Sequence, residues 1–446
     1  MELEIQERKP WSTKVKSCLI HRLGIASVID FARKNSVSMY KHNLVCKWYI
    51  FPWYYLGGII LTLFTIQIVT GFLLLFYYKP TPEAAHESIV RIMEEVPNGW
   101  LIRSVHSWSA KLMIGILFAH LFRTMIMKAY RRPREITWIS GMFLLIISLA
   151  LGFSGYLLPW TELSFSATKV GTGLAKKVPI VGNYIFYLLR GTENISGDTL
   201  MRFFGLHVCI LPLGLGIILA IHIWLIQVHG MSVPITTERQ HRKKMMYFFP
   251  YLLARNIVIG IVVLGIVVTL AVLLPKGISN KANPLAPAPA GIRPEWFFVF
   301  LFQTLKYIPS KILFVDGELF GLFIIGLGVI FLFLVPFLDR KAYRGKKDKL
   351  FTAIAIFLLV YIVAFTITGY IPTGSKSSEA TQNPANTAIS EEANVDEEIH
   401  PTLTKNRILG LIGFWSILLF IIVFLILKIR HYNRLTEQGY YGKNVE

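Results

Sequence analysis

Four histidines stand in two apolar stretches of the sequence with closely matched spacing. His106 and His120 are spaced i, i+14, and His207 and His222 are spaced i, i+15. In an α-helix these separations correspond to ~3.9 and ~4.2 turns, so both members of each pair face nearly the same way. At 1.5 Å per residue the two histidine levels are separated by roughly 21 Å, which fits within a hydrocarbon core of about 30 Å.

Imidazole nitrogens at matched depths can serve as paired axial ligands. An imidazole in lipid is costly and needs a partner, and two antiparallel helices would place His106 opposite His207 and His120 opposite His222. Haem iron accepts two such nitrogens, so the pattern predicts two non-covalent b haems stacked across one membrane. The alternative is that each histidine only hydrogen-bonds a neighbouring helix, but four of them at matched depths favour ligation.

The composition predicts an all-α polytopic membrane protein. Of 446 residues, 54% are hydrophobic and 16% are charged. The net charge of +20 comes from basic residues in short loops between apolar spans, which membrane orientation explains better than nucleic-acid binding. The three cysteines form no CxxCH motif, no paired CxxC site and no disulfide framework. Any cofactor must therefore be held mainly without thiols.

About eight apolar spans are each near or above the ~20 residues that a transmembrane helix needs. Lys and Arg concentrate in alternate loops, which places those loops and both termini in the cytoplasm by the positive-inside rule. The loops of the other side are longer and carry most of the acidic residues. The spans are expected at about 49–77, 109–129, 135–158, 203–228, 252–274, 315–338, 350–371 and 408–428.

Glycines in the first and third spans repeat the rise between the histidine levels. A flat porphyrin needs close approach to a backbone, which glycine permits because it has no Cβ. Taken singly these glycines are ordinary, because membrane helices use glycine for packing. The expected outer level is Gly71, His106, Gly155 and His207, and the expected inner level is Gly57, His120, Gly141 and His222.

Three arginines flank these levels. Arg103 and Arg202 lie just outside the expected outer histidines, and Arg123 lies just inside an inner one. Haem propionates need counter-charges there, so we interpret these arginines as cofactor-binding. Side chains that extend to the membrane surface are the alternative for each of them.

Several strings resemble the cytochrome b family of quinol oxidases that work with a Rieske protein. They are LIRSVHSWSA, AHLFR, RRPREITW, GYLLPW and TLMRFFGLH. The i, i+15 spacing of the second histidine pair is similar to that of the cytochrome b6 branch, and RPEWFF (293–298) resembles the PEWY motif of subunit IV. The resemblance covers roughly residues 40–371, as if b6 and subunit IV were fused. It implies an N-terminal four-helix dihaem bundle followed by subunit IV-like helices.

The resulting domain prediction has five parts. They are a basic cytoplasmic arm (1–48), a b6-like dihaem domain (49–235), a subunit IV-like three-helix domain (236–371), an acidic polar linker (372–407), and an extra transmembrane helix with a cytoplasmic tail (408–446).

The resemblance implies that quinol binds at the outer surface between GYLLPW (155–160) and RPEWFF. One electron would pass to a Rieske iron–sulfur partner and the other across two b haems to an inner quinone site, coupled to proton translocation. Glu295 would accept a quinol proton, with Pro294, Trp296 and Tyr156 at the same catalytic site. The alternative is that Glu295 only caps or orders its loop. The resemblance further implies a homodimer, a cytochrome c-type subunit, and a lipid environment that is the bacterial cytoplasmic membrane.

Three departures from the family pattern affect the quinone sites. Phe297 stands where the family usually has Tyr, which removes a hydroxyl near the quinol. Tyr55 stands where the b6 branch has the cysteine that attaches a third haem, so no covalent haem is expected. Gln227 and Val228 replace a basic pair near the inner quinone site, where His229 could act as a proton donor.

Two other functions compete with this interpretation. A dihaem membrane anchor of a dehydrogenase or hydrogenase would need no outer quinol pocket, which RPEWFF argues against. A proton-coupled transporter would use its intramembrane histidines as a relay and would bind no haem. The transporter hypothesis leaves the matched histidine and glycine levels unexplained.

Overall fold

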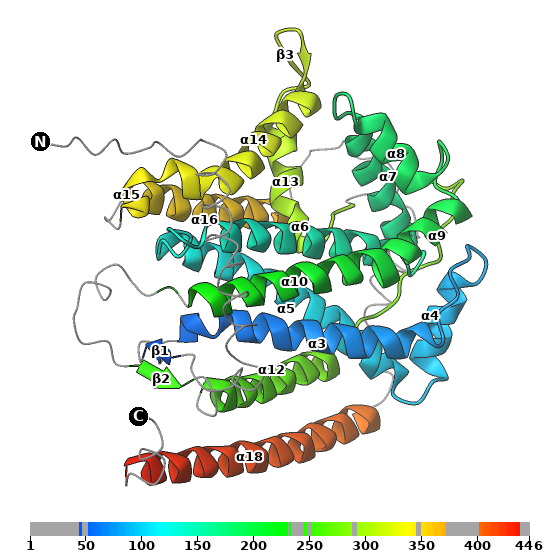
Figure 1. Cartoon of the computed structure of the whole chain (residues 1–446). Coiled ribbons are helices and arrows are strands. Elements are labelled where there is room, and N and C mark those ends of the chain that lie inside the picture. The colour runs from blue at the N-terminus through cyan, green and yellow to red at the C-terminus, as the bar shows by residue number, and fades with distance from the viewer. Residues whose placement is uncertain are drawn as a thin grey trace, which may run out of the picture.

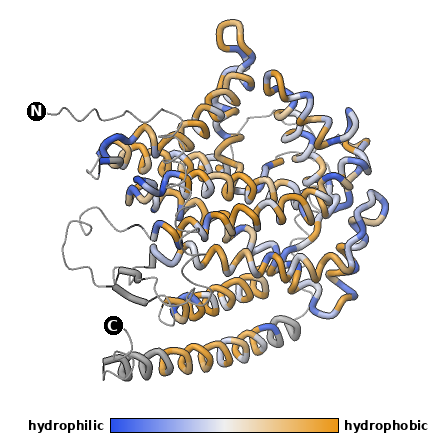
Figure 2. Tube along the Cα trace, viewed as in Figure 1, coloured by the Kyte–Doolittle hydropathy of each residue, from blue (hydrophilic) through white to orange (hydrophobic). Residues whose placement is uncertain are grey.

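The computed structural model describes residues 44–46, 52–230, 232, 245–247, 252–287, 292–344, 349–371 and 401–437. Within these ranges, eight helices are long and apolar enough to cross a membrane, which confirms the predicted fold class. Figure 2 shows apolar residues along the length of these helices and hydrophilic residues gathered at their ends. Most of the predicted arm (residues 1–43) and of the acidic linker (residues 372–400) lie outside the described residues.

Four of the membrane-length helices form the N-terminal bundle. α3 packs against α5, and α10 packs against α6 (Figure 1). The fourth crossing is one continuous run in which α9 leads through a π-helical turn, η3, into α10. The bounds are α3 (Leu56–Leu75), α5 (Gly99–Ile126), α6 (Glu135–Leu157), α9 (Gly197–Gly205), η3 (Leu206–Ile210) and α10 (Leu211–His229).

The second half of the chain adds helices to both sides of this bundle. α12 packs on α3 and α5, α14 packs on α6, and α13 and α16 pack together beside α5. The last helix, α18, lies along α12 (Figure 1). The bounds are α12 (Leu253–Leu273), α13 (Trp296–Tyr307), α14 (Gly317–Leu338), α15 (Arg340–Tyr343), α16 (Lys349–Tyr370) and α18 (Pro401–Glu437).

Shorter elements lie at the two ends of the membrane helices. One end, on the right in Figure 1, carries α4, α8 and α9 and is called the α4 end. The opposite end carries α15 and is called the α15 end. The remaining bounds are β1 (Leu44–Cys46), η2 (Pro52–Tyr54), α4 (Ala85–Glu94), α7 (Glu162–Lys176), α8 (Gly182–Arg190), β2 (Met245–Tyr247), β3 (Lys311–Ile312) and β4 (Val315–Asp316), with β1–β2 and β3–β4 antiparallel.

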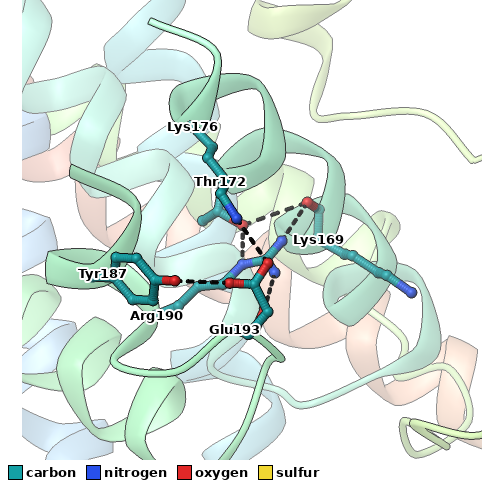
Figure 3. Close-up of polar contacts among 6 residues, drawn as sticks. All are labelled: Lys169, Thr172, Lys176, Tyr187, Arg190 and Glu193. Atoms are coloured by element: carbon teal, nitrogen blue, oxygen red, sulfur yellow. Dashed lines mark hydrogen bonds and ion pairs between the residues drawn. The ribbon is translucent and has the colours of Figure 1, made fainter. Parts of the chain in front are cut away.

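A polar cluster ties α7 to α8 at the α4 end, as Figure 3 shows. Arg190 donates from Nε to Thr172 Oγ1 (2.7 Å) and from Nη2 to the Lys169 carbonyl (2.8 Å). Glu193 accepts from Lys176 Nζ at 2.7 Å and from the Tyr187 hydroxyl at 2.9 Å. These bonds lower the pKa of the Glu193 carboxyl. The long loop after α6 is therefore a packed helical hairpin that covers this end of the bundle.

A buried ion pair joins the two halves of the chain at the α15 end. Lys128, after α5, lies 3.5 Å from the fully buried Asp339 that follows α14. The Tyr130 hydroxyl donates to Asp339 at 2.6 Å. Asp339 also accepts from the Ala342 amide at 2.9 Å, and this hydrogen bond caps the start of α15. The buried carboxylate thus has several polar partners, as a charge removed from water requires.

Candidate functional site

The structure brings together the residues that the sequence assigns to each histidine level. His106 on α5 faces His207 in η3, with ring centroids 6.3 Å apart and ring planes at 74°. Gly71 lies against His106, and Gly155 lies against His207. We call this set the His106 level. His120 and His222 are within electrostatic range of each other and face Gly57 and Gly141 respectively, which forms the His120 level.

The separation of His106 and His207 fits one metal ion between two imidazoles. The centroid of an imidazole lies roughly 1.15 Å from its nitrogens, given ring bonds of about 1.33–1.4 Å. A bond from metal to imidazole nitrogen is about 2.0–2.1 Å. Two such ligands in line across one metal therefore place the ring centroids roughly 6.3 Å apart, and the observed distance is 6.3 Å. The spacing has room for one metal ion between the imidazoles, and it also lies within the range of an edge-to-face ring contact.

Hydroxyl groups on the neighbouring helices set the tautomer of two histidines. The Thr70 hydroxyl donates to a carbonyl of its own helix at 2.6 Å, so its oxygen accepts from His106 Nδ1 at 2.8 Å. The Ser140 hydroxyl likewise donates within α6 and accepts from His222 Nδ1 at 2.8 Å. A proton held on Nδ1 leaves the lone pair on Nε2, which is the form that ligates a metal.

The other two histidines, His207 and His120, differ in the hydrogen bonding of Nδ1. His207 Nδ1 lies 3.1 Å from the Leu151 carbonyl, which only accepts, and 3.2 Å from Ser154 Oγ. This again places the proton on Nδ1. His120 Nδ1 is buried and has no hydrogen-bond partner among the described residues. Gly57, the glycine that His120 approaches, follows Leu56, which has no hydroxyl. Each of the other three glycines follows a Thr or a Ser.

A glycine lies where each histidine ring approaches a neighbouring helix, and the need for it differs among the four positions. A Cβ on Gly155 would lie 2.5 Å from His207 Cε1, and a Cβ on Gly71 would lie 3.2 Å from His106 Cε1. At the His120 level the corresponding distances are 3.4 Å from Gly141 to His222 and 3.8 Å from Gly57. The approach is thus tightest at the His106 level, where bare backbone leaves room for a flat ring system.

The three predicted arginines have different surroundings. Arg103 is buried and donates to the carbonyls of Lys276 (2.7 Å) and Gly277 (3.2 Å). Arg202 donates to two carbonyls in α8, the nearer at 2.9 Å. Arg123 stacks 4.0 Å over the Tyr54 ring, and its buried Nε has no partner in the described part of the chain. Arg123 therefore has a buried donor left for an anionic group, and a propionate contact stays a prediction for all three arginines.

Glu295 is the N-cap residue of α13, directly before Trp296, but its side chain does not cap the helix. Its backbone carbonyl starts the helix, whereas its side chain makes no capping hydrogen bond. Glu295 Oε2 instead lies 3.5 Å from Lys111 Nζ on α5, with side chains 18% and 26% exposed respectively. Tyr156 on α6 and Tyr370 on α16 are both within electrostatic range of Glu295. The half-buried Pro294 precedes it.

The two aromatic residues after Glu295 fix α13 against the bundle. A Cβ on Gly115 of α5 would lie 3.5 Å from the Trp296 indole, and a Cβ on Gly152 of α6 would lie 2.8 Å from the Phe297 ring. Phe297 is only 3% exposed. A carboxylate is therefore held at the α4 end between α5, α6 and α16, on a helix start that packs tightly on both sides.

A second cation lies near this carboxylate. Lys276 follows α12, and its backbone amide donates to Ser104 Oγ at 3.0 Å. Burial lowers the pKa of Lys276, and repulsion by Lys111 lowers it further. The attraction of the Glu295 carboxylate opposes both effects. The region thus combines one acid with several cations at the border of the apolar bundle.

Tyr55 lies at the His120 end of the first helix. It is 6% exposed and stands immediately before α3, which begins at Leu56. The predicted first span, 49–77, begins before α3, and Cys46, the cysteine nearest to Tyr55 in the sequence, lies in strand β1. Nearby, Arg134 donates to the carbonyls of His229 and Gly230, each at 3.1 Å. The inner quinone site predicted at Gln227, Val228 and His229 is tested by none of these contacts.

We predict that this chain carries no covalently attached haem. A thioether bond needs a cysteine sulfur, and the aligned position holds the phenol of Tyr55. Peroxidase staining of the denatured chain on a gel should give no band at its mass, because non-covalent haem is lost there. The Tyr55→Cys variant tests the position directly, since a stained band in the variant alone would show that only the sulfur was missing. A stained wild-type band would contradict the prediction.

Several functional candidates were missed by the sequence-based prediction. Lys111 is a charged residue in a membrane-length helix, which is a signal in itself. The hydroxyls of Thr70, Ser140 and Ser154 each stand directly before a glycine of the histidine levels. That repeated pair of residue types was the available signal for the histidine partners.

Eight membrane-length helices, with two histidine levels inside the first four, define a multi-pass membrane protein. A sequence profile described as cytochrome b/b6/petB matches residues 41–230, and one described as cytochrome b (C-terminal)/b6/petD matches residues 281–386. The chain belongs to the cytochrome b family, as the b6-like and subunit IV-like strings predicted.

Relatives support the same family across most of the chain. A cytochrome bc complex cytochrome b subunit from Chlorobaculum thiosulfatiphilum is 45% identical over 331 residues, which is 74% of this chain and 76% of the relative. Cytochrome b6 from Prochlorococcus marinus (strain MIT 9515) is 43% identical over 224 residues, or 50% of this chain and 99% of the relative. A solved structure of a hyperthermophilic respiratory complex III matches with a TM-score of 0.65 and 27% identity, covering 90% of this chain and 98% of that chain.

Proposed function

We propose that this chain is the quinol-oxidising subunit of a proton-translocating bc- or b6f-type complex. The observation that carries the proposal is the Glu295 carboxylate, which is free of any capping role, pairs with Lys111 and lies within electrostatic range of Tyr156. A carboxylate in such a place can accept a proton from a quinol hydroxyl. Pro294 and Trp296 would set its position by holding the start of α13 against α5.

Two non-covalent b haems, when bound, would supply a one-electron route between the two sides of the membrane. His106 and His207 would hold one of them, and His120 and His222 the other. Arg123 would face a propionate through its unpartnered Nε. The two electrons of the quinol would divide between this route and a Rieske iron–sulfur partner.

The α4 end would be the outer side of a bacterial cytoplasmic membrane. Support comes from the basic residues of the opposite end, such as Lys128, Arg131 and Arg340, because basic loops stay in the cytoplasm. Both termini would then be cytoplasmic. An inner quinone site would lie near the His120 level, where Tyr55 fills the place of a third haem. A second copy of this chain and a cytochrome c-type subunit would complete the complex.

The proposal is tested by adding quinol to the purified complex together with an oxidant that keeps the Rieske centre oxidised. Reduction of haem b on quinol addition, seen as α-band absorbance, is the expected result. Haem absorbance that quinol leaves unchanged would indicate a dihaem anchor for another enzyme. No haem absorbance at all would indicate the transporter alternative.

A further inference from the structure

Lys111 is a charged residue inside a membrane-length helix, and the proposed reaction does not yet use it. It lies on α5, between His106 and His120 and nearer to His106. Charged side chains at such depths are costly and are retained mainly where they pair or serve function. Lys111 Nζ lies 3.5 Å from Glu295 Oε2 and 5.7 Å from the centre of the Trp108 ring. The same carboxylate that would take the quinol proton is thus paired with a fixed cation.

The backbone segments that carry Lys111 and Glu295 are each held in place by a neighbouring tryptophan. The Trp108 indole, beside Lys111, donates to the Leu274 carbonyl at 2.8 Å. Trp296, next to Glu295, packs against Gly115, which is one turn after Lys111 on the same helix. The side chains therefore approach each other from elements that are already held together. The pair is not needed to bring α13 to α5, because the indole of Trp296 does so.

Burial makes this pair different from the surface pairs of the same end. The Lys111 and Glu295 side chains are 26% and 18% exposed, whereas those of Lys281 and Glu87 are 40% and 56% exposed although they lie only 2.6 Å apart. Exposed pairs are screened by water and salt and contribute little. A half-buried cation acts more strongly on its partner, because less water lies between them.

We propose that Lys111 is a positioning residue for proton transfer from quinol to Glu295, a role that rests on the proposed function. The ammonium lies against Oε2, which leaves the other oxygen to accept the proton. In the transfer the quinol O–H bond breaks and an O–H bond forms on Glu295, giving a quinol anion and a neutral carboxyl group. The neutral group is no longer attracted to Lys111, so it can turn and pass its proton to water at the α4 end.

Other ionisable groups on the neighbouring elements lie within electrostatic range of Glu295. Tyr156 comes from α6, Tyr370 from α16, and Lys276 from the segment after α12. Arg293, close before Glu295 in the chain, stacks on Tyr370 at 5.5 Å. Of these cations, Lys111 is the one that forms an ion pair with Glu295 among the described residues. It should therefore have the largest effect on protonation of this carboxylate.

The test measures quinol oxidation against pH in the assembled complex carrying Lys111→Met. The acidic limb of the pH–rate profile should move to higher pH by about 1 unit or more, because a carboxylate that loses a neighbouring cation holds its proton more tightly. Lys111→Arg keeps the charge and should keep the wild-type limb. Lys281→Gln, which removes a cation from the exposed pair, is the matched control and should leave the profile unchanged.

The outcomes separate this inference from the proposed function. A wild-type pH profile in Lys111→Met, alongside slow turnover in Glu295→Gln, would overturn the role of Lys111 and leave the proposed function in place. Normal turnover in Glu295→Gln would overturn the proposed function itself. Lys111→Gln replaces Lys111→Met if the latter does not assemble. Infrared difference spectra of the Glu295 carboxyl band then give the protonation midpoint without turnover, and a midpoint equal to that of wild type would also reject the inference.

Discussion

Replacing His106 with alanine is expected to remove one b haem from the purified protein and to leave the other in place. The reason is that the rings of His106 and His207 face each other with room for one metal ion between them, and their tautomers leave Nε2 available to hold it. His207→Ala should give the same half-loss, and His120→Ala or His222→Ala should remove the other haem. Reduced-minus-oxidised spectra and haem extraction measure the content directly.

A matched control for these variants is His86→Ala. His86 lies on α4, outside the bundle, and its Nε2 is 2.9 Å from the Ser279 carbonyl. The change removes an imidazole from the same side of the protein without touching either histidine level, so both haems should remain. Retention of full haem content in all four bundle variants would reject the ligand assignment.

Glu295→Gln is expected to slow quinol oxidation while both haem spectra stay intact. Glutamine preserves the shape of the side chain but cannot take up a proton, and loss of one proton acceptor costs roughly 10²- to 10⁴-fold in rate. The side chain caps nothing on α13, so the helix start should survive the change. Steady-state turnover from quinol to an acceptor measures the effect.

Glu318→Gln is the matched control for this second prediction. Glu318 is an exposed acid at the same end, paired with Lys177 at 2.5 Å. Its removal should leave turnover unchanged, since surface ion pairs contribute little. Wild-type turnover in Glu295→Gln across the whole pH range would return Glu295 to the role of ordering its loop.

The sequence by itself determined the membrane class, the number of membrane-length spans and the two levels of glycines and histidines. The length of an apolar segment is enough to predict a membrane helix, because in lipid the backbone must satisfy its hydrogen bonds within that segment. The spacing of two residues in a helix is enough to predict whether they lie on the same face, because the helical repeat is fixed. Both arguments are local in the chain, so they need no knowledge of which helices become neighbours.

The tertiary structure decided the features that depend on neighbours. The i, i+15 spacing of His207 and His222, against i, i+14 in the first pair, is accommodated by the π-helical turn at Leu206–Ile210, where His207 lies. A π turn inserts one extra residue into a helix, which restores the facing of His207 and His222. Helical spacing measured along the sequence could not show this, because the turn departs from the regular repeat.

The contacts of the candidate quinol site were likewise beyond reach of the sequence. Lys111 and Glu295 belong to different halves of the chain and meet because α13 packs on α5. The partners of Arg103 and Arg202 are backbone carbonyls, of the segment after α12 for Arg103 and of α8 for Arg202. Side-chain pairing across the bundle is set by helix packing, and packing depends on the three-dimensional fit of many surfaces rather than on the spacing of any one motif.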